Sequence, residues 1–244
     1  MFKLIKARVK FIILTMLGFY IIACSSQEYT TAKLAIQQSE WSKAEEWLPK
    51  AMAVEPDNPE IPIVYAIEVH ARNGDWQGMY DMFQKALAID ANKKVEIRAV
   101  FLPVSEQVNN YTQYYWAEEF NKGVEKFKEI QEDPDNRKIY LGEAIEYFMS
   151  ASIINPNDPQ TYTTLSKCYL DLDDKDNAMK FIKTAVEKDP EGFNSNFSAG
   201  QILLRCGMGS EVVIPYYEKA VQIEPSNSNA LRELASMYYD LGKK

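Results

Sequence analysis

Apolar residues recur three or four positions apart over most of this chain, in stretches separated by short polar turns. This spacing places them on one face of a helix and predicts a largely helical chain. The clearest stretches cover residues 43–56, 142–156, 176–190 and 209–225, and each ends at a proline. Because a proline ring cannot continue a helix, each stretch is expected to be one helix that stops there.

The same stretches repeat one another at a fixed interval. Three residues of 142–156 have identical counterparts 34 positions later: Ala144 and Ala178, Ala151 and Ala185, and Pro156 and Pro190. Further copies lie at 43–56 and 209–225, and a degenerate copy lies at 80–91. A period of this length predicts a stack of similar helix pairs, because one pair alone cannot bury its apolar face.

The best-preserved unit, from Pro159 to Pro190, resembles the tetratricopeptide repeat. In that family, small residues at fixed positions let two antiparallel helices, A and B, approach closely, and larger residues fill the space between repeats. This unit supplies the expected pattern with Leu165, Ser166, Tyr169, Ala178, Ile182, Ala185 and Pro190. The resemblance implies an all-α fold, a right-handed α-solenoid of antiparallel helix pairs over residues 29–244.

We expect about five repeats, at 27–58, 59–91, 117–156, 157–190 and 191–225, and then a single helix A at 228–242. Repeats two and five each contain one extra residue. The evidence is that Ala51 and Ala86, and likewise Ala185 and Ala220, lie 35 positions apart. This leaves the register of those two units open.

Residues 92–138 do not follow the period. We interpret residues 95–108 as a helix that Pro103 ends or kinks, and residues 110–131 as an extended helix A of repeat three. Residues 132–137 form a turn-rich insertion. Whether residues 92–116 form a complete degenerate repeat stays open.

Four aromatic residues cluster near the start of the long helix: Tyr111, Tyr114, Tyr115 and Trp116. One interpretation is an aromatic platform for a peptide or a sugar. The other is packing against neighbouring repeats, which the helical spacing of Trp116, Phe120 and Phe127 favours.

The first 24 residues have the pattern of an export signal. Residues 1–10 carry four basic and no acidic residues, and residues 11–24 form an apolar run too short to span a bilayer. The sequence Ile21-Ile22-Ala23-Cys24 resembles the lipobox of bacterial lipoproteins. That resemblance implies cleavage of a signal peptide, residues 1–23, palmitate-type acylation of Cys24, and a short tether at 24–28. The alternative is an uncleaved signal anchor.

Composition narrows the possible ligands. The net charge of −8 disfavours nucleic acid, whose phosphates would be repelled. Cys168 and Cys206 are expected to be free thiols, and the sequence has no pattern that indicates a metal site or a cofactor. The single histidine, His70, is expected to have a structural role, and no catalytic triad can be assembled around it. We therefore expect no enzyme.

In the tetratricopeptide family, ligands bind along a concave wall made by A helices. By resemblance, the groove residues here are Gln160, Thr163, Lys167, Asp171, Arg232 and Tyr239. We expect a non-catalytic adaptor or scaffold for a protein or peptide partner, held by its lipid anchor in the bacterial cell envelope. Ser25 and Ser26, which are not acidic, favour the periplasmic side of the outer membrane. The alternatives are a carbohydrate- or peptidoglycan-binding lipoprotein, an enzyme with carboxylates around His70, and self-assembly through the last helix.

Overall fold

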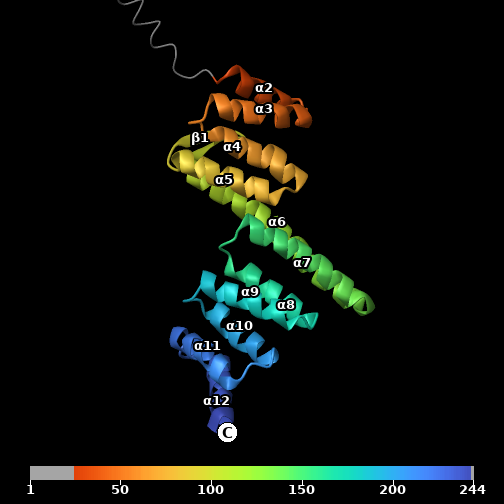
Figure 1. Ribbon diagram of the computed structural model, residues 1–244, viewed down its shortest axis with the longest axis vertical. Coiled ribbons are helices and arrows are strands. Elements are labelled where there is room, and N and C mark those ends of the chain that lie inside the picture. Colours follow the sequence, from red (N-terminus) through yellow and green to blue (C-terminus); the bar gives the residue numbers. More distant parts are fainter. Residues whose placement is uncertain (1–24, 243–244) are drawn as a thin grey trace, which may run out of the picture. The chain divides into compact units, whose positions relative to one another are not determined.

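The computed structural model describes residues 25–242, and these are mainly helical (Figure 1). The helices are α2 (Gln27–Gln37), α3 (Trp41–Val54), α4 (Glu60–Tyr65) with its continuations η1 (Ala66–His70) and η2 (Ala71–Asn73), α5 (Trp76–Asp90), α6 (Val104–Glu132), η3 (Pro134–Asn136), α7 (Arg137–Ile154), α8 (Pro159–Asp171), α9 (Lys175–Lys188), α10 (Phe193–Arg205), α11 (Ser210–Ile223) and α12 (Ser228–Gly242). The chain divides into two compact units between Val108 and Asn109. The expected helical-repeat fold is confirmed for the described residues.

In the first unit, α2 packs on α3, and α4 packs on α5 (Figure 1). The core is made by side chains with no exposed surface, among them Tyr29, Leu48 and Ile61. Four fully buried alanines, Ala32, Ala35, Ala44 and Ala51, lie in the same cluster as these larger side chains. Small residues let two helices approach closely, which is the role that the repeat pattern gave them.

A two-stranded hairpin, β1 (Lys94–Ile97) and β2 (Val100–Pro103), corrects the prediction of a helix over residues 95–108. The helix begins only at Val104. Val95 and Ile97 alternate with exposed residues and are buried, as period-two spacing requires of a strand. The turn between the strands is formed by Arg98 and Ala99, both at positive φ. Such turns usually contain glycine or asparagine, and because this one has neither, the sequence carried no turn signal here.

Two polar side chains hold this hairpin in place. The Arg98 guanidinium lies 2.9 Å from Oε1 of Glu68, a carboxylate that is only 7% exposed. The side-chain amide of Gln107 donates a 2.7 Å hydrogen bond to the carbonyl of Val100. These tertiary contacts favour the hairpin over the helix that the short apolar run also allows.

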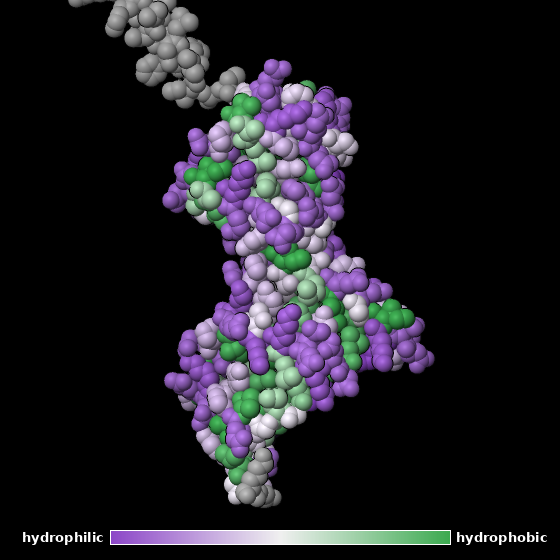
Figure 2. Space-filling view, viewed as in Figure 1, coloured by the Kyte–Doolittle hydropathy of each residue, from purple (hydrophilic) through white to green (hydrophobic). Residues whose placement is uncertain are grey.

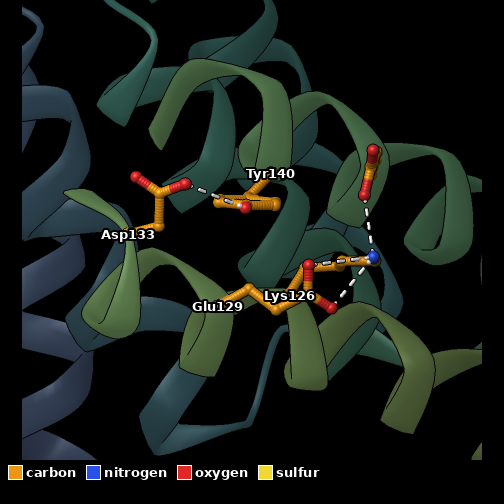
Figure 3. A network of polar contacts seen from close by, with 5 residues as sticks. Lys126, Glu129, Asp133 and Tyr140 are labelled. Carbon is orange, nitrogen blue, oxygen red and sulfur yellow. Dashed lines mark hydrogen bonds and ion pairs between the residues drawn. The ribbon is translucent and has the colours of Figure 1, made fainter. Parts of the chain in front are cut away.

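In the second unit, the predicted long helix over residues 110–131 lies within α6 and is confirmed. A polar network joins α6 to α7 (Figure 3). Nζ of Lys126 lies 3.0 Å from Glu129 on α6 and 2.8 Å from Glu143 on α7, and these carboxylates raise the pKa of Lys126. The Tyr140 hydroxyl donates to Asp133 at 3.3 Å. These polar contacts hold the end of α6 against α7.

The helix pairs of the second unit are close-packed at small residues. The hydroxyl of Ser166 on α8 donates a 2.7 Å hydrogen bond to the Ala178 carbonyl of α9. Gly200 of α10 lies against the Tyr217 ring of α11, where an added Cβ would come within 2.5 Å of a ring carbon. Hydrophilic side chains cover most of the visible face of each unit (Figure 2). Most large apolar side chains are therefore used in packing between helices, while a few, such as Leu34 of α2 and Leu231 of α12, are exposed.

Candidate functional site

Two neighbouring hollows follow helices α8 and α10 in the second unit. The first has a volume of about 430 Å³ and the second about 420 Å³. The first is lined by Asp158, Pro159, Gln160, Thr163, Thr164, Lys167, Asp189, Asn194, Ser195 and Ser198. The second is lined by Lys167, Asp171, Gln201, Ile202, Leu204, Arg205, Tyr217 and Glu233. Lys167 lines both hollows, and we call them together the α8–α10 groove.

Helix α8 presents its groove residues because its other face is used for packing. Asp158 caps the helix by accepting a 2.7 Å hydrogen bond from the Thr161 N–H, and Pro159 occupies the first turn. Leu165 and Ser166 are fully buried. Gln160, Thr163, Lys167 and Asp171 follow one another at intervals of three or four residues and therefore share the opposite face.

The two acidic residues of the second hollow lie close to arginine side chains. Asp171 lies 2.8 Å from Arg137 of α7 and 3.6 Å from Arg205 of α10. Glu233 of α12 lies 3.4 Å from Arg232. Both acidic side chains of the second hollow thus lie beside arginines, and Lys167, which lines both hollows, is exposed.

The structure brings four of the six predicted groove residues together. Gln160, Thr163 and Lys167 line the first hollow, and Lys167 and Asp171 line the second. The other two, Arg232 and Tyr239 on α12, line neither hollow, although Tyr239 is 63% exposed. Helix α12 contributes Glu233 instead.

Helix α10 supplies groove residues that the sequence reasoning did not name. Asn194, Gln201 and Arg205 line the groove and lie 34 positions after Gln160, Lys167 and Asp171, respectively. The period itself was the signal that could have found them.

The aromatic residues of α6 fall into two groups. Trp116 stacks on Phe120 at 5.1 Å, and its indole N–H donates a 2.9 Å hydrogen bond to Thr161. It is therefore part of the packing between α6 and α8. Tyr111 stacks on Tyr115 at 6.5 Å, with ring planes 24° apart.

Tyr114 is the most exposed of the four aromatic residues, at 62%. Its ring meets the edge of Tyr115 at an interplanar angle of 78°. The rings of Tyr114 and Tyr115 therefore do not share one plane, as a flat platform would require.

The remaining candidate residues have structural surroundings. Nδ1 of His70 lies 2.7 Å from the Asp75 carboxylate, and the His70 ring packs on Tyr65. Cys168 and Cys206 are free thiols, and burial raises the pKa of Cys168 to about 12. The described residues contain no group of three or more His, Cys, Asp or Glu side chains placed to bind a metal ion.

Two expectations concern the N-terminus and the membrane. Cys24 and the signal-like residues before it lie outside the described residues. None of the helices within residues 25–242 combines the length and the apolar character needed to cross a bilayer.

Comparison with known proteins gives one family. Residues 159–191 match the family model for a tetratricopeptide repeat. No curated protein sequence matched the chain. Solved structures are also similar, and three of them have TM-scores between 0.41 and 0.45.

The first tetratricopeptide domain of Spaghetti (RPAP3), bound to an HSP90 peptide, is 20% identical with a TM-score of 0.45, over 53% of this chain and 94% of that one. A thermophilic tetratricopeptide protein of Thermus thermophilus is 17% identical with a TM-score of 0.41, over 87% and 99%. The second tetratricopeptide domain of human RPAP3, in complex with an HSP70 peptide, is 18% identical with a TM-score of 0.43, over 52% and 98%. Residues 159–191 therefore match a tetratricopeptide repeat, and they lie within a series of helix pairs.

Proposed function

We propose that this chain is a lipid-anchored, non-catalytic adaptor of the bacterial cell envelope that holds an extended segment of a partner protein in the α8–α10 groove. The observation that carries the proposal is the groove itself. Side chains of two successive A helices line it, and Lys167 joins its two halves.

The groove has the chemistry to hold an extended peptide. Such a peptide leaves many backbone N–H and C=O groups unpaired, and these need donors and acceptors from the protein that binds it. Gln160, Thr163, Asn194 and Gln201 offer amide and hydroxyl groups along the groove. Lys167 adds a cation that favours an acidic side chain in the bound segment.

The membrane anchor rests on the sequence alone. The basic start, the apolar run and Cys24 after Ile21-Ile22-Ala23 support acylation of Cys24. Several acyl chains hold a protein on a bilayer far more stably than one. The periplasmic face of the outer membrane is the proposed location because neither Ser25 nor Ser26 is acidic.

A carbohydrate-binding function is less well supported. It would use the tyrosines of α6, but Tyr114 stands edge-on to Tyr115, and Tyr111 and Tyr115 turn their faces toward one another. Stacking on a sugar needs an open ring face, so we favour the α8–α10 groove as the binding site.

Site-specific photo-crosslinking in cells tests the adaptor proposal. A photo-reactive residue replaces Gln201, which is exposed in the groove, and in a control chain it replaces Lys183, which is exposed on helix B of repeat four. We expect a discrete protein adduct from position 201 and none of the same mass from position 183.

Reversing the charge of Lys167, which lines both hollows, provides a second test. Lys167→Glu should reduce the adduct about tenfold, because like charges at an interface are strongly unfavourable. The matched change Lys183→Glu should leave the yield as in the parent chain. Equal adducts from positions 201 and 183, or an adduct insensitive to Lys167→Glu, would contradict binding in the groove. Cys24→Ser tests the anchor separately, since it should move the chain from the membrane to the soluble fraction.

A further inference from the structure

The residues that follow Cys24 are fixed to the first repeat. The Ser26 N–H donates a 2.5 Å hydrogen bond to Oε1 of Glu55, a residue 29 positions away at the end of α3. The Ser26 side chain caps α2 by accepting a 3.1 Å hydrogen bond from the Tyr29 N–H. Nζ of Lys33 donates a 3.2 Å hydrogen bond to the Ser25 hydroxyl.

Glu55 is itself held in position. Its second carboxylate oxygen accepts a 2.8 Å hydrogen bond from the Asn58 side chain. Partial burial raises the pKa of Glu55, but the hydrogen bonds from Ser26 and Asn58 outweigh this effect and lower the pKa below its ordinary value. The carboxylate is therefore ionised at neutral pH, and its bond to Ser26 is a charge-assisted one.

This attachment leaves almost no free tether. Helix α2 begins at Gln27, so only Ser25 and Ser26 separate it from Cys24. Two residues span at most about 7 Å even when fully extended. The headgroup layer on each side of a bilayer is also roughly 5–7 Å thick. A lipid group attached to Cys24 would therefore hold the surface around Ser25 close to the headgroups.

The surface around Ser25 has a mixed composition. A hollow of about 510 Å³ is lined there by Ser25, Val54, Glu55, Pro56, Asp57, Asn58, Glu60, Lys93, Lys94 and Val95, and we call these residues the N-terminal face. Lys93 and Lys94 stand among Glu55, Asp57 and Glu60, and the apolar Val54 is 56% exposed. Interspersed charges of both signs match a zwitterionic phospholipid surface, whose headgroups each carry one ammonium and one phosphate.

We propose that the N-terminal face lies directly on the headgroups of a zwitterionic bilayer, with Ser25 and Ser26 as a rigid link to the acylated Cys24. This inference rests on the proposed lipid anchor, and it adds that the first repeat has a fixed orientation at the membrane. The acyl chains supply the affinity, and the bonded link supplies the orientation.

Depth-dependent quenching tests the proposal on the purified full chain. The chain is bound to vesicles of phosphatidylcholine and phosphatidylethanolamine that contain a headgroup-attached nitroxide quencher. A fluorophore is placed at Asp57→Cys, on the N-terminal face, or at Gln38→Cys, at the far end of α2. Both carry Cys206→Ser, so that the half-exposed thiol is not labelled. The 11 residues of α2 separate the two ends by about 16 Å.

We expect quenching at position 57 to exceed that at position 38 at least threefold. Inserting 12 Gly and Ser residues between Cys24 and Ser25 should abolish the difference, because such a linker has an end-to-end distance of roughly 19 Å. Glu55→Ala should reduce the difference, and Glu55→Gln, which retains an oxygen acceptor for the Ser26 N–H, should preserve it. Circular dichroism establishes that each variant is folded.

The outcomes separate this inference from the anchor on which it rests. If mass spectrometry finds no acyl chains on Cys24 and the chain does not float with the vesicles, the proposed lipid anchor is wrong. The proposed orientation of the first repeat on the membrane is then wrong as well. If the chain is acylated and floats, but positions 57 and 38 are quenched equally, the anchor stands and the fixed orientation is overturned. Quenching at position 57 that is unchanged by the 12-residue linker overturns it as well.

Discussion

Repeat two (α4, η1, η2 and α5) and repeat five (α10 and α11) both contain one residue more than the 34-residue period, and they absorb it in different places. Repeat four (α8 and α9) has no extra residue and serves as the reference. Its helices are joined by a three-residue turn, Leu172–Asp174, in which Asp173 has a φ of 63°. The Asp174 N–H closes the turn on the Tyr169 carbonyl at 2.9 Å.

Repeat two has the same turn, and its extra residue lies inside its first helix. The Asp75 N–H closes on the His70 carbonyl at 2.9 Å, five positions back, as in repeat four. Pro59 precedes Asp75 by 16 positions, whereas Pro159 precedes Asp174 by 15. The additional residue is taken up by η1, Ala66–His70, which is a π-helix. A single inserted residue is accommodated in this way when the helix on both sides must keep its face.

Repeat five keeps its first helix regular and lengthens the turn. Helix α10 ends at Arg205, 34 positions after α8 ends at Asp171, but α11 starts at Ser210, 35 positions after α9 starts. The turn therefore has four residues, and it includes Gly207, whose φ of 92° suits glycine. The extra residue lies in solvent and disturbs no helix face.

The difference shows that the cost of an insertion depends on what surrounds it. All residues of η1 except His70 are buried, so repeat two has built its core around the π-helix. In the turn of repeat five, Cys206 and Met208 pack against the core, but an added Cβ at Gly209 would have nothing within 4 Å, so this position tolerates change. The predictions below use this contrast, beginning with the largest expected effect.

Deleting Ala66 should destabilise the first unit by at least about 3 kcal/mol. The deletion would convert η1 into a regular α-helical turn, and the core that packs around the wider π-helical turn would no longer be filled. Ile67 and Val69, which are 2% and 4% exposed, would lose their present places in the core, and burial of each contributes about 1.5–3 kcal/mol. Urea unfolding followed by circular dichroism measures the change.

Deleting Gly209 is the matched control in repeat five. It shortens an exposed turn to the three residues that repeat four uses, and it should cost no more than about 1 kcal/mol. Equal costs for the two deletions would show that η1 is not integral to the core of repeat two.

Gly200→Ala should destabilise repeat five by about 1–3 kcal/mol. The new Cβ would meet the Tyr217 ring at 2.5 Å, and Tyr217 is only 1% exposed and cannot move without repacking α11. Gly209→Ala, in the same repeat but with nothing within 4 Å of its Cβ, is the control and should change stability by less than about 0.5 kcal/mol. Thermal and urea unfolding compare the two variants, and a neutral Gly200→Ala would contradict the close approach of α10 and α11.

The same contrast shows what could be predicted from sequence. The period located the helices of repeat four and, through Gln160, Thr163, Lys167 and Asp171, one wall of the groove. It also revealed that repeats two and five were each one residue too long. It could not place the extra residue, because the sequence of Ala66–His70 is compatible with an α-helix or a π-helix, and the choice depends on tertiary packing such as that of Ile61 and Val69.

The β1–β2 hairpin could not be predicted for a related reason. Residues 95–102 form a short apolar run whose spacing fits either a helix or two strands. The choice is made by Arg98 with buried Glu68 and by Gln107 with the Val100 carbonyl, and these partners cannot be paired from the sequence.

Asp75→Ala should cost repeat two about 1 kcal/mol at pH 7. Asp75 caps α5 by accepting a 2.9 Å hydrogen bond from the Gly78 N–H, and loss of such a cap typically costs this amount. The Gly78 N–H and then His70 hold the pKa of Asp75 below its ordinary value. A carboxylate with a lowered pKa stabilises the fold above its unfolded-state pKa, and this contribution disappears as the pH falls through the folded-state pKa.

The stability difference between the parent chain and the Asp75→Ala variant should therefore begin to shrink as the pH falls below about 4. Urea midpoints at pH 7 and pH 3.5 measure this convergence. A difference that stayed constant between the two pH values would show that the charge of Asp75 is not what stabilises α5.

The smallest expected effect is a gain in repeat five. Gly209 precedes α11 and offers no side-chain cap, whereas Asp75 and Asp174 cap the corresponding helices of repeats two and four. Its backbone, at φ −70° and ψ 160°, is one that aspartate adopts without strain, and nothing lies within 4 Å of an added Cβ. Gly209→Asp should therefore stabilise the chain by about 0.5 kcal/mol, both by capping α11 and by restricting the unfolded chain. Gly209→Ala separates the two contributions, because it restricts the unfolded chain without supplying a cap. If the aspartate variant unfolds at the same urea concentration as the alanine variant, the extra residue of repeat five has moved the turn out of capping geometry.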